Sequence, residues 1–141
     1  MKFKIFSIFI AATIFAVSCK KDKEETTNTN NNNSTPTPVA SITIHSPIAG
    51  TTIEHMDTVE IDVHIDADFE MHGYDAYLIN ETADDTVWTA SLHDHANSYE
   101  VTGEWINVVT DHSDMKLKVV AEIDHDGNTT EKEIEFHCHP M

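Results

Sequence analysis

The sequence predicts an all-β domain, an antiparallel β-sandwich of seven to eight short strands with Greek-key connections. Two observations support this fold class. Apolar and polar residues alternate in one run after another, and no stretch shows a convincing helical period. Turn-forming residues, rich in Gly, Pro and Asp, separate these runs. The part of the chain with this pattern, residues 39–141, is long enough for one domain and too short for two.

The clearest strand begins at Val59, where apolar residues alternate with acidic ones and with His64. Ser46-Pro47 ends the first strand, and Asp126-Gly127-Asn128 joins the last two, because glycine accepts the positive φ of a tight hairpin. The fifth expected strand, residues 99–109, is either continuous or interrupted at Gly103. In chain order, the expected strands cover residues 42–44, 59–65, 74–78, 87–92, 99–109, 115–123 and 134–138.

A signal peptide, residues 1–18, precedes the domain. Lys2 and Lys4 supply its positive start, and the apolar run of residues 5–17 is too short to span a bilayer as a stable helix. Ala16-Val17-Ser18-Cys19 resembles the lipobox of bacterial outer-membrane lipoproteins. The resemblance implies that Cys19 becomes the first mature residue and carries acyl chains such as palmitate, which anchor the protein in a membrane.

Residues 19–38 form a predicted tether. A charged run, residues 20–25, resembles the surface-export signal of some Gram-negative lipoproteins, although a plain solvated spacer is an equal alternative. Lys20 resembles outer-membrane sorting more than inner-membrane retention. Residues 26–38, TTNTNNNNSTPTP, contain no apolar side chain that could offset the entropy of ordering, so we expect disorder.

Two motifs of residues 39–141 resemble bacterial immunoglobulin-like modules. Ile42-x-Ile44-x-Ser46-Pro47-x-x-Gly50 is similar to their first strand and bend, and Ala121-x-x-Asp124-x-Asp126-Gly127-Asn128 is similar to their final hairpin. The resemblance covers most of this region and implies the immunoglobulin-like sandwich. The whole layout also resembles small surface lipoproteins, which implies no activity.

The charge of the domain limits its partners. Residues 39–141 contain 22 acidic residues, three lysines and no arginine, a formal net charge of −19 with histidine neutral. Such a domain repels nucleic acid and anionic lipid and attracts cations. Once Cys19 is lipidated, Cys138 is the remaining cysteine, so no intramolecular disulfide can form.

All ten histidines of the chain lie between His45 and His139. In an antiparallel sandwich, alternate connections lie at the same end. One end is therefore expected to gather His55, His112, His137 and His139, and the other His72, His93, His95 and His125. His45 and His64 are expected on outward strand faces. His137 and His139 form the preferred centre, because Cys138 and Met141 lie nearby, although Cys138 falls on the inward side of its strand.

These groups suggest metal sites. Histidines two apart on a strand project from the same face, about 6.5–7 Å apart, and can converge on one ion. Neighbouring Asp94, Asp111 or Asp114 could ligate directly or orient a ring. Imidazole suits zinc, copper and nickel alike, so the ligands do not choose among these metals. The loop around Asp124 is interpreted as a hairpin turn first and a calcium site second, because the closing glutamate is missing.

The sequence therefore predicts a lipid-anchored protein of the outer membrane that binds transition-metal ions for sequestration or delivery, with the side of the membrane that it faces left open. No nucleophile, phosphate-loop or His-Glu-x-x-His motif is present, so we expect no enzyme. The alternative is an adhesion or interaction module that meets a protein or a glycan without metal, with Trp88 or Trp105 as a sugar contact. A third hypothesis makes the histidines a pH sensor.

Overall fold

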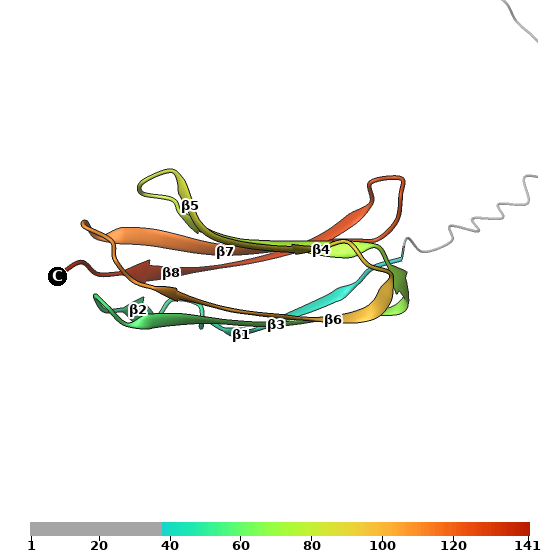
Figure 1. Ribbon diagram of the computed structural model, residues 1–141, viewed down its shortest axis with the longest axis horizontal. Coiled ribbons are helices and arrows are strands. Elements are labelled where there is room, and N and C mark those ends of the chain that lie inside the picture. The colour runs from blue at the N-terminus through green and yellow to red at the C-terminus, as the bar shows by residue number, and fades with distance from the viewer. Residues whose placement is uncertain (1–37) are drawn as a thin grey trace, which may run out of the picture. The chain divides into compact units, whose positions relative to one another are not determined.

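The computed structural model describes residues 38–141, so the predicted signal peptide, the predicted lipidation site at Cys19 and nearly all of the predicted tether lie outside the described residues. Eight strands form two facing layers (Figure 1). Within residues 38–141 no helix is long and apolar enough to cross a membrane. The strands are β1 (Ser41–Ser46), β2 (Thr52–Ile53), β3 (Thr58–Met71), β4 (Gly73–Asn80), β5 (Asp85–Leu92), β6 (Ala96–Ile106), β7 (Ser113–Glu122) and β8 (Thr129–Cys138).

One layer has the strand order β1-β3-β6 and the other β2-β8-β7-β4-β5. Except for the two-residue β2, which runs parallel to β8, neighbouring strands pair antiparallel. This order confirms the predicted all-β, immunoglobulin-like sandwich. The fourth strand of the sequence prediction, β5, pairs with β4 at the edge of the larger sheet.

The core lies between the two layers and follows the predicted alternation. The inward side chains of β3, from Val59 to Ile65, are 0–2% exposed, and those of β7, from Met115 to Ala121, are 0% exposed. Full burial of an aliphatic side chain of this size contributes roughly 1.5–3 kcal/mol. With no disulfide among the described residues, this apolar interior holds the domain together.

The alternative of a break at Gly103 is wrong, because strand β6 runs through this residue. Glycine is required there, since a Cβ would be 2.4 Å from Cζ2 of Trp88. His93 and His95 lie in the connection from β5 to β6, as predicted, so the spacing of strand neighbours does not apply to this pair.

The connections gather at two ends of the sandwich, which we name by one histidine each. The His72 pole comprises residue 72 and the connections 93–95 and 123–128. The His139 pole comprises residues 47–57, which include β2, the connections 81–84 and 107–112, and residues 137–141 at the end of β8 and beyond it. Each pole contains the four histidines that the sequence assigned to it.

Candidate metal centre

His72 alone connects β3 in the smaller sheet to β4 in the larger one. Its amide donates to the carbonyl of Glu122 at the end of β7, at 2.8 Å. Gly73 follows with φ 154°, and a Cβ at this position would lie 2.1 Å from the carbonyl oxygen of Leu92. Only glycine fits such a close approach of two strands. His72 is therefore fixed against the ends of both β5 and β7.

The connection 93–95 is fastened by Tyr99, a buried residue of β6. The Tyr99 hydroxyl lies 3.2 Å from the carbonyl of Met71 and within hydrogen-bond distance of the carbonyl of Asp94. Burial raises the pKa of Tyr99, so the phenol stays a donor near neutral pH. One side chain thus joins the residue before His72 to the residue before His95.

The loop carrying His125 is held by Asp124. The Asp124 carboxylate accepts hydrogen bonds from the amides of Asp126 (2.9 Å) and Asn128 (3.2 Å) and from the Asn128 side chain (2.7 Å). These bonds, the Asn128 side chain first, lower the pKa of Asp124. The predicted turn is therefore confirmed as one closed by this aspartate. His125 is exposed at its tip.

Three imidazoles converge at the His72 pole. One ring nitrogen each from His72, His95 and His125 lies within 4.8 Å of the others. The ring centroid of His72 is 3.8 Å from that of His125 and 4.4 Å from that of His95. In a tetrahedral zinc site the ligand atoms lie about 3.3 Å apart, so small side-chain rotations would bring the three nitrogens onto one ion. Of the side chains the structure describes, no other set of three His, Cys, Asp or Glu converges in this way.

The surroundings of His72 and His95 suit a metal. Nδ1 of His95 is 3.1 Å from a carboxylate oxygen of Glu70, which leaves Nε2 of His95 available as a ligand. Nδ1 of His72 is enclosed and has no hydrogen-bond partner. Burial, and then the nearby His125, His95 and His93, lowers the pKa of His72. Neutral imidazole is the form that binds a metal.

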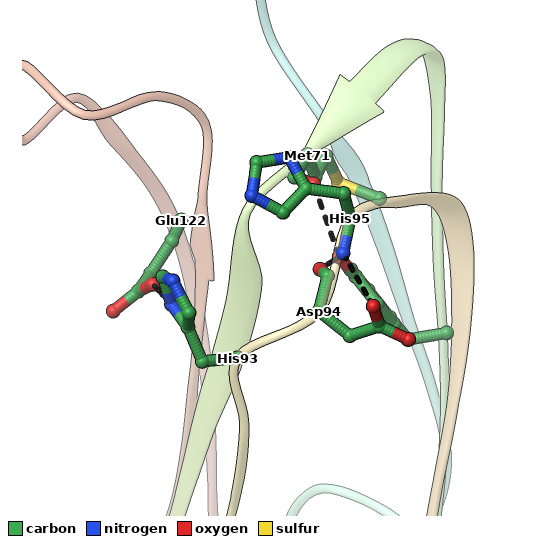
Figure 2. Close-up of polar contacts among 6 residues, drawn as sticks. Met71, His93, Asp94, His95 and Glu122 are labelled. Atoms are coloured by element: carbon green, nitrogen blue, oxygen red, sulfur yellow. Dashed lines mark hydrogen bonds and ion pairs between the residues drawn. The ribbon is translucent and has the colours of Figure 1, made fainter.

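His93 stays outside this group. Its ring centroid is 6.4 Å from that of His72 and 6.1 Å from that of His95, and its Nδ1 is 3.4 Å from Glu122 (Figure 2). His93 and Glu122 line a cavity of about 230 Å³ that also borders His72 and His125. The open side of the three imidazoles therefore has room for water or a small ligand.

The His139 pole is arranged differently. The ring centroids of His112 and His139 are 4.5 Å apart, and Nδ1 of His139 is 3.6 Å from a carboxylate oxygen of Glu54. His137 is turned toward Asp114, its register partner on β7, at 2.8 Å. Nδ1 of His55 is enclosed without a hydrogen-bond partner. The geometry thus favours the other pole over His137 and His139, the centre that the sequence preferred.

The remaining candidates have structural surroundings. Cys138 is fully buried, and burial raises the pKa of its thiol to about 11, so it is a packing residue rather than a thiolate ligand. His64 lies between Glu100 and Asp66, each 2.6 Å away, and hydrogen bonds to these carboxylates, Glu100 first, raise its pKa. His45 is exposed on β1, as expected.

Of the three predicted carboxylates, only Asp114 contacts a histidine ring among the described polar contacts. Asp94 accepts from the amide of His95, and Asp111 from the Thr110 hydroxyl. The carboxylates that do meet the histidines at the two poles, besides Asp114, are Glu54, Glu70 and Glu122. Sequence reasoning missed these three glutamates because their partners are 25 to 85 positions away along the chain, and it missed Tyr99 because Met71, one of its partners, is 28 positions away.

The three lysines of the domain are engaged on the sheets. Lys116 pairs with Glu81 at 2.6 Å and Lys118 with Glu131 at 2.8 Å. Lys132 donates to the carbonyl of Ile42 at 2.8 Å. Glu81 belongs to the His139 pole, but within the described domain no lysine contacts a histidine of either pole.

Comparison with known proteins adds little to this description. No protein-family model matches the chain, and no curated protein matches it. Among solved structures, the chain is similar to the fibronectin(III)-like modules of Clostridium thermocellum CbhA, with 20% sequence identity and a TM-score of 0.44. The match covers 72% of this chain and 98% of that chain. The strand order itself defines the class: an immunoglobulin-like sandwich, here with histidine-rich loops.

Proposed function

We propose that this protein is a non-catalytic module that binds one transition-metal ion through His72, His95 and His125. The observation that carries the proposal is the convergence of their ring nitrogens to within 4.8 Å. The three residues come from three different connections, and each connection is held by its own contact, through Gly73, Tyr99 or Asp124. Such support is what a preformed site needs.

The chemistry of the donors favours zinc, copper or nickel. Three imidazoles without a thiolate suit these ions, whereas calcium and magnesium require oxygen ligands. His95 and His125 are exposed, and the open side of the group meets the cavity beside His93. An ion with an open coordination position can exchange ligands, so the arrangement suits sequestration and delivery of the metal.

Calorimetric titration of the purified protein with Zn²⁺, Cu²⁺ and Ni²⁺ at neutral pH tests the proposal. We expect one tight event per chain that is lost in His72→Ala/His125→Ala. His45→Ala/His64→Ala, a matched control on the strand faces, should retain it. If the wild-type protein shows no saturable binding in the micromolar range or tighter, the metal-binding function is wrong.

In the same proposal, acyl chains on Cys19 hold the module at the outer membrane, with the domain facing the cell surface. The support is the lipobox-like Ala16-Val17-Ser18-Cys19 and the charged run after it. Fractionation of cells that produce Cys19→Ala provides the test. A variant that still partitions with membranes would exclude lipid anchoring, and protease accessibility on intact cells would decide the facing.

A protein or glycan partner is the second candidate function. Trp105 lines a cavity of about 270 Å³ together with Val87 and Val108, and Val108 is 56% exposed. An aromatic ring in such a hollow is a common contact for a partner. Loss of glycan or cell-surface binding in Trp105→Ala, with metal titration unchanged, would favour this function.

A further inference from the structure

A buried amide joins three chain segments at the His139 pole. The side chain of Asn107, which is 0% exposed, donates to the carbonyls of Ile53 (3.0 Å) and His139 (2.9 Å). Its oxygen accepts from the amide of Val109 at 3.2 Å. The backbone of Asn107 also pairs with both Met56 and Asp57. The segments that carry Glu54, His112 and His139 are therefore fixed to one another.

The side chains on these segments offer metal ligands. The rings of His112 and His139 are in contact, with centroids 4.5 Å apart and planes at 80°. A carboxylate oxygen of Glu54 lies 3.6 Å from Nδ1 of His139. His55, the next residue in the chain, has an enclosed Nδ1 with no hydrogen-bond partner. Among the described residues, no lysine contacts either imidazole. His112 is exposed and His139 is partly exposed at this end of the domain.

We infer that His112 and His139, with Glu54, form a second and weaker site for a divalent transition-metal ion. Two imidazoles and one carboxylate suit Cu²⁺ best, since nitrogen and oxygen ligands bind Cu²⁺ more tightly than the other divalent ions of the first transition row. The site is weaker than the one at the His72 pole, because its three donor groups do not converge as closely. His137 takes no part, since its ring is bonded to Asp114.

The experiment is a titration of the purified protein with Cu²⁺ alone, followed by calorimetry and by electron paramagnetic resonance of the bound ion. The wild-type protein should bind two ions per chain in two resolved events. His112→Ala/His139→Ala should remove the weaker event and leave the tight one. Glu54→Gln should weaken the second event about tenfold. A signal from two equatorial nitrogens should remain in His72→Ala/His125→Ala.

Controls separate this site from adventitious binding to surface histidines. His45→Ala/His64→Ala and His137→Ala should both retain the second event. Saturation of the wild-type protein at one ion, or survival of the weaker event in His112→Ala/His139→Ala, would overturn the inference. Neither result bears on the tight event, which is judged by the His72→Ala/His125→Ala variant, so the two proposals fail separately.

Discussion

The two poles contain the same number of histidines but use them differently. At the His72 pole, three rings face one another, and Glu70 and Glu122 bind rings from the outside. At the His139 pole, the rings of His112 and His139 contact each other, with Glu54 beside His139, while His137 is turned toward Asp114. The neighbours of each ring therefore decide how many imidazoles converge at a pole.

The poles share one construction principle. Each has a buried polar side chain that fastens its loops: Tyr99 at the His72 pole and Asn107 at the His139 pole. The His72 pole adds a one-residue connection and a glycine that no other residue can replace without a clash. Variants of these residues can change one pole while they leave the other intact.

The largest effect is expected from Gly73→Ala. The new Cβ would lie 2.1 Å from the Leu92 carbonyl oxygen at a φ that disfavours other residues, so the free energy of unfolding should fall by about 3 kcal/mol or more. Urea denaturation measures this. Gly50→Ala, in the His139 pole, is the control: its φ is 72° but no atom lies within 4 Å of the new Cβ, so about 1 kcal/mol is expected. Equal losses in the two variants would contradict this account.

Asn107→Ala comes next. It removes the donor to two carbonyls and the acceptor for the Val109 amide, and we expect a loss of about 2–3 kcal/mol in unfolding free energy. The weaker Cu²⁺ event should be lost while the tight event stays unchanged. Asn97→Ala, an exposed position on β6, is the control. A change in the tight event would show that the poles are not independent.

Tyr99→Phe should act mainly on the His72 pole. Loss of the hydroxyl removes the link between Met71 and Asp94 at a cost of about 1 kcal/mol, with retention of the ring in the core. The tight metal event should weaken about tenfold, as expected for a residue that positions ligands. Tyr74→Phe is the control, since its ring packs at 5.5 Å from that of Tyr99. Equal affinities in both variants would exclude the positioning role.

The smallest expected effect is a pH dependence of the folded-state stability. It comes from His64, a residue of β3 between the two poles. Its carboxylate partners raise its pKa above the ordinary 6.5, so the protonated ring stabilises the folded state. This contribution is fully present below about pH 6.5 and is lost as the pH rises through the raised pKa. The difference in Tm between wild type and His64→Gln should therefore shrink from about pH 6 to about pH 8.5. A Tm difference that grows as the pH rises would contradict the stabilising role of the protonated His64 ring.

The fold was largely predictable because it depends on local patterns. Alternation located seven strands, and the antiparallel arrangement alone sorted the histidines into two ends. That sorting needs only the direction of each strand and does not depend on which strands are neighbours. The pairing of β5 with β4 at a sheet edge therefore leaves it unchanged. Strand β2 escaped detection because two residues, Thr52 and Ile53, are too short to show a period.

The details of the sites were not predictable, because they depend on contacts between distant segments. Nothing near His95 in the sequence shows that Tyr99 also reaches Met71, or that Glu70 orients the His95 ring. The surroundings of His137 were hidden for a similar reason: they depend on the register that places Asp114 opposite it on β7. A break at Gly103 stayed open as an alternative because the side chain that requires this glycine, Trp88, belongs to the other sheet.

The engagement of Lys116, Lys118 and Lys132 with the sheets has a kinetic consequence. Lys116 and Lys118 pair with carboxylates and Lys132 with a backbone carbonyl, so within the described domain no lysine contacts the carboxylates that meet the histidines of the two poles. A cation that diffuses toward either pole is attracted from a distance, which can raise association rates about tenfold or more. At physiological ionic strength this attraction reaches only about 8 Å. Salt should therefore slow capture of a metal ion far more than it speeds its release.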